Sequence, residues 1–161
     1  MDREARHSMS EPEICIRKVQ KKDYKKVVKI SIDSFPEEDA EEIITSLFEI
    51  EHFYVAELGG GEGVVVGFVV FGIYSIKTTH IMILAVESVH RRKGIGSKLL
   101  ERVIEITDML PINLIRLEVR LTNTAAIKFY EEYEFKITGT IKQYYDDLSD
   151  AYLMTRKIEK I

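Results

Sequence analysis

The segment His90–Ser97 gathers three cationic side chains and two glycines between an apolar segment, His80–Val86, and an amphipathic one, Gly94–Met109. The first turn of a helix carries partial positive charge, so three cations there cost stability unless an anion lies among them. Glycine lets the backbone approach such an anion closely, and the first-turn N–H groups donate hydrogen bonds to it. The segment therefore predicts a strand, a turn and a helix, with a site for an anion such as a pyrophosphate at the turn. The alternative is a basic surface cluster beside two turn glycines.

The rest of the chain also divides into segments of strand and helix character. Strands are expected at Ile14–Val19, His52–Leu58, Val64–Tyr74, His80–Val86, Asn113–Val119, Phe135–Tyr144 and Ala151–Ile158, and helices at Tyr24–Phe35, from Glu37–Asp39 onward, at Gly94–Met109 and at Asn123–Tyr133. This order predicts an α/β fold around a mixed sheet. Because 161 residues is close to the common size of one domain, we expect a single domain over residues 14–161 after a flexible arm, residues 1–13.

The composition indicates a soluble cytoplasmic protein. Lys and Arg number 23 against 27 Asp and Glu, which leaves a net charge of −4, so no overall positive field attracts nucleic acid. The single cysteine, Cys15, excludes an intramolecular disulfide, and no apolar run approaches the ~18 residues of a membrane span. The four histidines lack metal-ligand spacing, so we expect no metal site. Asn and Gln together number only four, which favours a thermophilic source.

Several motifs in the second half of the chain together resemble the GNAT acetyltransferase superfamily. They are Arg91-x-x-Gly94-x-Gly96 after the strand that ends in Leu84-Ala85-Val86, Leu117-Glu118-Val119-Arg120, Asn123-x-x-Ala126-x-x-x-Tyr130, Phe135, Tyr144-Tyr145 and Asp150 to Met154. Within the superfamily the chain is most similar to the protein N-terminal α-amine acetyltransferases, the RimI type and its archaeal relatives. The resemblance implies a single-domain GNAT-like fold, in which four helices flank a mixed, mostly antiparallel sheet with splayed central strands. It also implies acetyl-CoA as the acetyl donor and CoA as the product.

The resemblance assigns the acetyl-CoA site to three segments. In the family the pantetheine arm lies between the splayed strands and pairs with main chain, while the pyrophosphate lies on the turn. The residues assigned in this way are Leu84, Ala85, Val86, Arg91, Arg92, Lys93, Gly94, Ile95, Gly96, Ser97, Asn123, Ala126 and Tyr130. Asn123 is equally well explained as a helix N-cap, since Asn favours that position, and one side chain can serve both purposes.

Three side chains resemble the catalytic groups of the family. Tyr130 resembles the general acid, because a phenol with a pKa near 10 is a suitable proton donor to a thiolate whose pKa is about 8.5. The alternative is a core tyrosine. Glu118 matches the proton acceptor of the RimI type; the alternative is an ion pair with Arg116 or Arg120, which share its face of the strand. His80 is the weaker second candidate for the base.

Substrate contacts are expected at Phe35-Pro36 and at Tyr144-Tyr145, which match positions that hold the first substrate residues in the family. Carboxylates near both pairs would attract a cationic amine. Those at residues 37–39 are equally well explained as the acidic first turn of a helix, which the helix dipole favours. The carboxylates of both groups are Glu37, Glu38 and Asp39, and Asp146 and Asp147.

We therefore expect an acetyl-CoA-dependent N-acetyltransferase whose substrate is a protein or peptide N-terminal α-amine. The alternatives are an acetyltransferase of small amines, such as polyamines or amino sugars, and a CoA-binding regulatory module without turnover. The sequence leaves open whether the protein is a monomer or a dimer.

Overall fold

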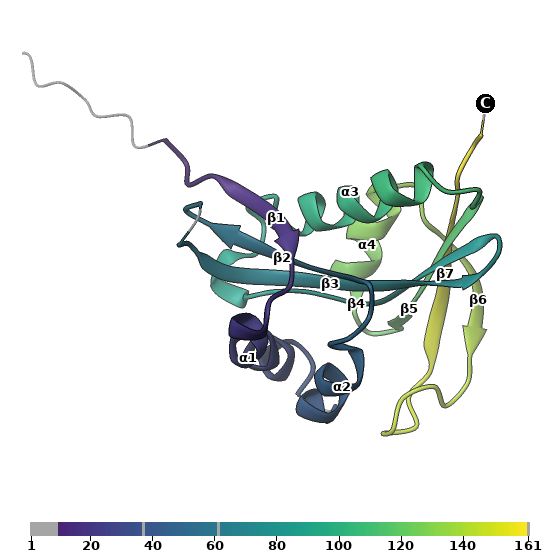
Figure 1. Ribbon diagram of the computed structural model, residues 1–161. Coiled ribbons are helices and arrows are strands. Elements are labelled where there is room, and N and C mark those ends of the chain that lie inside the picture. Colours follow the sequence, from purple (N-terminus) through teal and green to yellow (C-terminus); the bar gives the residue numbers. More distant parts are fainter. Residues whose placement is uncertain (1–9, 37, 61, 161) are drawn as a thin grey trace, which may run out of the picture.

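The computed structural model describes residues 10–36, 38–60 and 62–160, and it contains one seven-stranded sheet with helices on both faces (Figure 1). In chain order the elements are β1 (Ile14–Lys18), η1 (Lys21–Asp23), α1 (Tyr24–Ser34), α2 (Ala40–Leu47), β2 (His52–Leu58), β3 (Val64–Ser75), β4 (Thr78–Val86), η2 (Ser88–His90), α3 (Ile95–Asp108), β5 (Leu114–Arg120), α4 (Thr124–Glu132), β6 (Lys136–Ile141) and β7 (Ala151–Lys157). The order predicted from sequence is confirmed, and the bounds differ by a few residues. Residues 1–9 of the expected N-terminal arm lie outside the described residues.

The strand order is β1-β2-β3-β4-β5-β7-β6, and every neighbouring pair is antiparallel except β4 and β5. Those two parallel strands are paired only at their starts, from Thr78↔Leu114 to His80↔Arg116. Past that point β4 keeps its pairing with β3, as in Leu84↔Val69. The central strands therefore diverge, as expected, and leave the β5 side of Leu84–Val86 without a partner strand in the described part of the chain.

A β-bulge marks the place where the two strands separate. The register between β3 and β4 shifts so that Phe71 faces Ile81 while Val70 faces Ile83, which leaves Met82 as the extra residue. A bulge bends its strand and increases the local twist, so it turns β4 away from β5 directly after their last pair.

Each face of the sheet has its own hydrophobic core, because residues of the central strands alternate between the faces. The helices α3 and α4 cover one face, where Leu99 packs with Val69. The helices α1 and α2 cover the other face, where Ile30 and Ile44 pack with Phe68 (Figure 1). Among the described residues, no helix has the length and hydropathy needed to cross a membrane.

The end of α4 carries a backbone conformation that usually requires glycine. Glu134 has a φ of 65°, and the chain turns there so that the N–H of Phe135 donates to the carbonyl of Tyr130. A non-glycine residue in the left-handed region costs roughly 1 kcal/mol. This turn ends α4 just after Tyr130, which lies in the last turn of the helix.

Candidate active site

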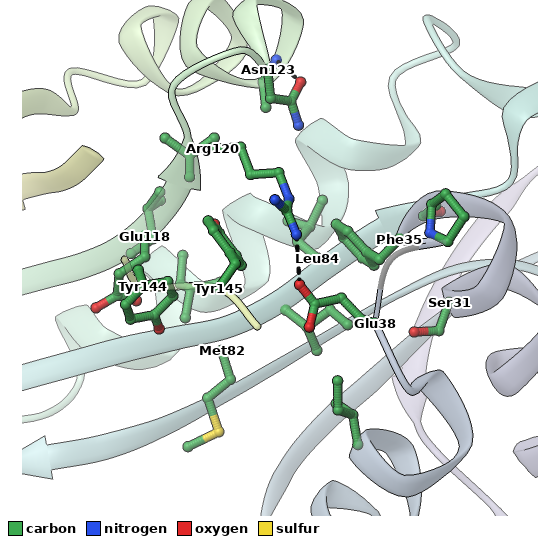
Figure 2. A pocket seen from close by; sticks show the side chains of 18 of the residues that line it. Ser31, Phe35, Glu38, Met82, Leu84, Glu118, Arg120, Asn123, Tyr144 and Tyr145 are labelled. Carbon is green, nitrogen blue, oxygen red and sulfur yellow. Dashed lines mark hydrogen bonds and ion pairs between the residues drawn. The ribbon is translucent and has the colours of Figure 1, made fainter. Parts of the chain in front are cut away.

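A cavity of about 540 Å³ lies where β4 and β5 diverge (Figure 2). Nine residues predicted from sequence line it: Phe35, Pro36, Leu84, Glu118, Asn123, Ala126, Tyr130, Tyr144 and Tyr145. Its lining does not include His80, Ala85, Val86 or the segment Arg91–Ser97. Further lining residues are Ser31, Ser34, Glu38, Ile43, Ile81, Met82, Ile83, Leu117, Val119, Arg120 and Asp146. The cavity thus brings together the predicted substrate residues, two of the three catalytic candidates and four of the cofactor residues, one of which, Tyr130, is also a catalytic candidate.

Glu118 lies at the centre of a charged cluster. Its Oε2 is 2.6 Å from Nε2 of His80, and its Oε1 accepts a hydrogen bond of 2.6 Å from Nη2 of Arg116. The parallel pairing of His80 with Arg116 brings the histidine beside β5, although 38 positions separate it from Glu118. From the sequence, His80 and Glu118 were alternative candidates for the base. In the structure the two side chains form one hydrogen-bonded pair. The ion pair with Arg116 is also present, whereas Arg120 bonds elsewhere.

The pKa of Glu118 is lowered from its ordinary value. Burial by itself raises the pKa of this carboxyl, whose side chain is 5% exposed, but the hydrogen bonds and charges of His80 and Arg116 outweigh that effect. Glu118 is therefore ionised at neutral pH and faces the cavity as a carboxylate.

Tyr130 is both a core residue and part of the cavity wall. Its ring packs on Phe135 at a centroid distance of 5.5 Å and on Phe129 at 5.1 Å, and the residue is 8% exposed. Burial raises its pKa above the ordinary value for a phenol, with a smaller contribution from Tyr145. The hydroxyl therefore keeps its proton at neutral pH, which leaves it available as a donor.

The two explanations of Asn123 are compatible. Its Oδ1 accepts a hydrogen bond of 3.2 Å from the N–H of Ala126, so the side chain caps α4. The amide nitrogen is the end of the side chain that faces the rest of the cavity lining in Figure 2. One residue thus begins the helix and presents a donor to the cavity.

The turn before α3 has the features of an anion cradle. Gly94 precedes the helix with a φ of 79°, and a Cβ built there would meet nothing within 4 Å. The side chains of Arg92 and Lys93 are exposed. Nε of Arg91 donates to the carbonyl of Val86, at 3.0 Å, so this residue partly holds the turn rather than reaching freely outward. Open space above a helix N-terminus flanked by cations fits a pyrophosphate.

The residues predicted to contact substrate lie around Arg120 in the cavity wall. In the sequence, Arg120 was considered only as an ion-pair partner of Glu118. Phe35 and Pro36 come from the end of α1, and Tyr144 and Tyr145 from the loop between β6 and β7. Burial raises the pKa of Tyr145 to about 12. The guanidinium carbon of Arg120 lies 3.9 Å from the centroid of the Tyr145 ring.

Most of the acidic residues expected to attract an amine have other partners. Asp39 caps α2 by accepting from the N–H of Glu42, at 3.1 Å. Glu38 and Asp147 both pair with Arg120, at 2.9 Å each. Glu37 lies outside the described residues. The cap by Asp39 agrees with the helix-start explanation, and the attraction of an amine by this group stays a prediction.

Comparison with known proteins places the chain among acetyltransferases. The model of the "Acetyltransferase (GNAT) family" matches residues 24–135. The chain is 32% identical to the N-alpha-acetyltransferase of Sulfolobus acidocaldarius, over 86% of this chain and 89% of that protein.

Two solved structures have the same fold. Ard1 from Thermoplasma volcanium superposes with a TM-score of 0.84 at 35% sequence identity, over 91% of this chain and 99% of that one. Naa50 of Arabidopsis thaliana, in complex with the bisubstrate analogue CoA-Ac-MVNAL, gives a TM-score of 0.77 at 25% identity, over 90% and 99%.

Proposed function

The chain belongs to the acetyltransferase (GNAT) family, and we propose that it is an enzyme that transfers the acetyl group of acetyl-CoA to the α-amine at the N-terminus of a protein. The observation that carries this proposal is that one cavity is lined by an ionised carboxylate, Glu118, and a protonated hydroxyl, Tyr130. The similarity to named N-alpha-acetyltransferases over most of the chain supports the α-amine as acceptor.

The fold offers acetyl-CoA two kinds of contact. The free edge of Leu84–Val86 has main-chain groups for an extended arm, and Asn123 has an amide donor beside it. The turn Arg91–Ser97 has first-turn N–H groups and cations for the pyrophosphate. When bound, acetyl-CoA supplies a thioester as the activated acyl group.

The residues in the cavity wall divide the proton transfers between them. Glu118 accepts the proton that the attacking amine loses, and His80 and Arg116 hold its carboxylate in place through both oxygens. Tyr130 donates a proton to the sulfur as the carbon–sulfur bond breaks. A base with a low pKa is adequate for an α-amine, because that amine has a pKa near 8 and is partly neutral at pH 7.

The open end of the cavity fits the first residues of a peptide chain. Two tyrosines and the Phe35-Pro36 pair form walls of mixed aromatic and polar character. The related Naa50 was solved with an analogue that joins CoA to a five-residue peptide sequence. By analogy, we expect a peptide N-terminus to lie between Glu118 and the loops that carry these residues.

Gly96→Glu is expected to lower the affinity for CoA by tenfold or more, at least ~1.4 kcal/mol. A Cβ at this position meets Phe129 at 3.5 Å, an ordinary contact, so the variant is expected to fold. The added carboxylate opposes an anion at the turn. Calorimetry of CoA binding measures the effect, with Gly96→Gln as the control of matched size. Equal CoA affinity in the Glu variant and the parent protein would contradict the anion cradle.

The acceptor is tested by incubating the protein with acetyl-CoA and either a peptide with a free N-terminus or spermidine. Thiol release is expected to be faster with the peptide by at least tenfold, because the aromatic side chains of the cavity wall can pack on the first residues of a peptide, which spermidine lacks. Faster release with spermidine would favour a small-amine acetyltransferase, and no release with any amine would favour a CoA-binding module.

A further inference from the structure

Arg120, the last residue of β5, contacts two segments that are distant in sequence and that both line the cavity (Figure 2). Its Nη2 donates to Glu38, between α1 and α2, at 2.9 Å. Its Nη1 donates to Asp147, at 2.9 Å, and to the hydroxyl of Ser149, both in the loop between β6 and β7. The guanidinium also stacks on Tyr145 of that loop. We call this group of five residues the Arg120 clamp.

The geometry of the clamp depends on arginine. A guanidinium is a rigid planar fork with several donors, so it can bond two carboxylates in fixed directions and stack on an aromatic ring at once. The side chains of Arg120 and Glu38 are 20% and 18% exposed, so solvent screens this pair less than a surface ion pair. The pKa of Arg120 is raised, because its two carboxylate partners outweigh the effect of burial.

Neither partner loop is a regular element. Glu38 lies between the end of α1 and the start of α2, and the other three partners lie between the end of β6 and the start of β7. Among the described residues, only the side chain of Arg120 donates hydrogen bonds to both the α1–α2 loop and the β6–β7 loop. The position of each loop is therefore tied to the end of β5.

We propose that Arg120 is a positioning residue that holds these two loops together as one peptide-binding wall, and so sets the affinity for the acceptor peptide. The inference rests on the proposed function. Without the clamp, the two loops must become ordered when the peptide binds, and that entropic cost weakens binding. Glu118 and Tyr130 lie outside these two loops, in β5 and α4. Turnover at saturating peptide is therefore affected less.

Steady-state kinetics of Arg120→Gln test this role. We expect the KM for a free-N-terminus peptide to rise by about tenfold, with kcat within about a factor of two and the affinity for CoA unchanged. Arg120→Lys keeps the charge but loses the fork, so it is expected to recover only part of the affinity. Arg102→Gln is the matched control: Arg102 pairs with Glu105 on the surface of α3, and its KM is expected to equal that of the parent protein. An unchanged peptide KM in Arg120→Gln would overturn the proposal.

A double-mutant cycle separates the clamp from direct substrate binding. Glu38→Gln is expected to raise the peptide KM in the parent protein and to have little further effect in Arg120→Gln. An equal effect in both backgrounds would show that Glu38 acts on the substrate itself, against the proposal.

Hydrogen exchange tests the clamp without any acceptor. Backbone amides of residues 38–40 and 144–149 are expected to exchange faster in Arg120→Gln, while those of β5 stay protected. Unchanged exchange in both loops would overturn the proposal. Failure of the parent protein to acetylate any peptide would instead refute the proposed function, and the exchange result would stand apart from it.

Discussion

Tyr130→Phe is expected to lower kcat by 10²–10⁴-fold while the affinity for CoA stays within about a factor of two of the parent value. The substitution removes one hydroxyl and keeps the ring that packs on Phe129 and Phe135. The lost group is the proton donor to the departing sulfur. Because burial keeps the pKa of Tyr130 above its ordinary value, the hydroxyl is protonated over the whole neutral range.

Single-turnover kinetics check this expectation together with calorimetry of CoA binding. Tyr133→Phe is the matched control, since Tyr133 contacts Phe129 from the same helix end but does not line the cavity. An unchanged single-turnover rate in Tyr130→Phe would assign the acid role to another group.

Glu118→Gln is expected to reduce kcat/KM for a free-N-terminus peptide by about 10²-fold near pH 7, with a smaller deficit near pH 9. Glutamine has the size of glutamate and keeps an oxygen for Arg116, so the cluster with His80 is expected to stay folded. The α-amine has a pKa near 8, so raising the pH supplies neutral amine without help from a base.

The sign of this pH dependence follows from the lowered pKa of Glu118. A carboxyl with a depressed pKa loses its charge only as the pH falls well below neutrality, so the parent enzyme keeps its base across pH 6.5–9. The rise of the parent rate with pH then reflects deprotonation of the substrate α-amine. Measuring kcat/KM of the parent and of Glu118→Gln over this range checks the expectation. A deficit of the variant that does not change with pH would show that Glu118 positions the substrate instead.

The sequence predicted the elements of this fold and their order because the local patterns agree with the tertiary structure. The cations and glycines of Arg91–Ser97 predicted a turn before a helix, and the structure has this turn with Gly94 at the helix start; the anion there stays a prediction. The resemblance assigned Asn123, Ala126 and Tyr130 to one site, and all three line the same cavity.

Features that arise from long-range pairing could not be predicted in this way. No glycine or proline in β4 signals the bulge at Met82, since the bulge depends on how β3 and β4 pair. The bond between His80 and Glu118 depends on the short parallel pairing of β4 with β5. The Arg120 clamp needs two loops that only the folded chain brings together.

Intact-mass measurement of two matched peptides shows whether the acceptor is an N-terminal α-amine. Both peptides contain one internal lysine, and they differ only in whether the N-terminus is free or blocked by acetylation. With acetyl-CoA at pH 7.5, we expect the free peptide to gain one acetyl group and the blocked peptide to gain almost none. The lysine ε-amine, with a pKa near 10.4, is largely protonated there and poorly matched to a weak carboxylate base. Equal acetylation of the two peptides would contradict the assignment of the enzyme to N-terminal α-amines.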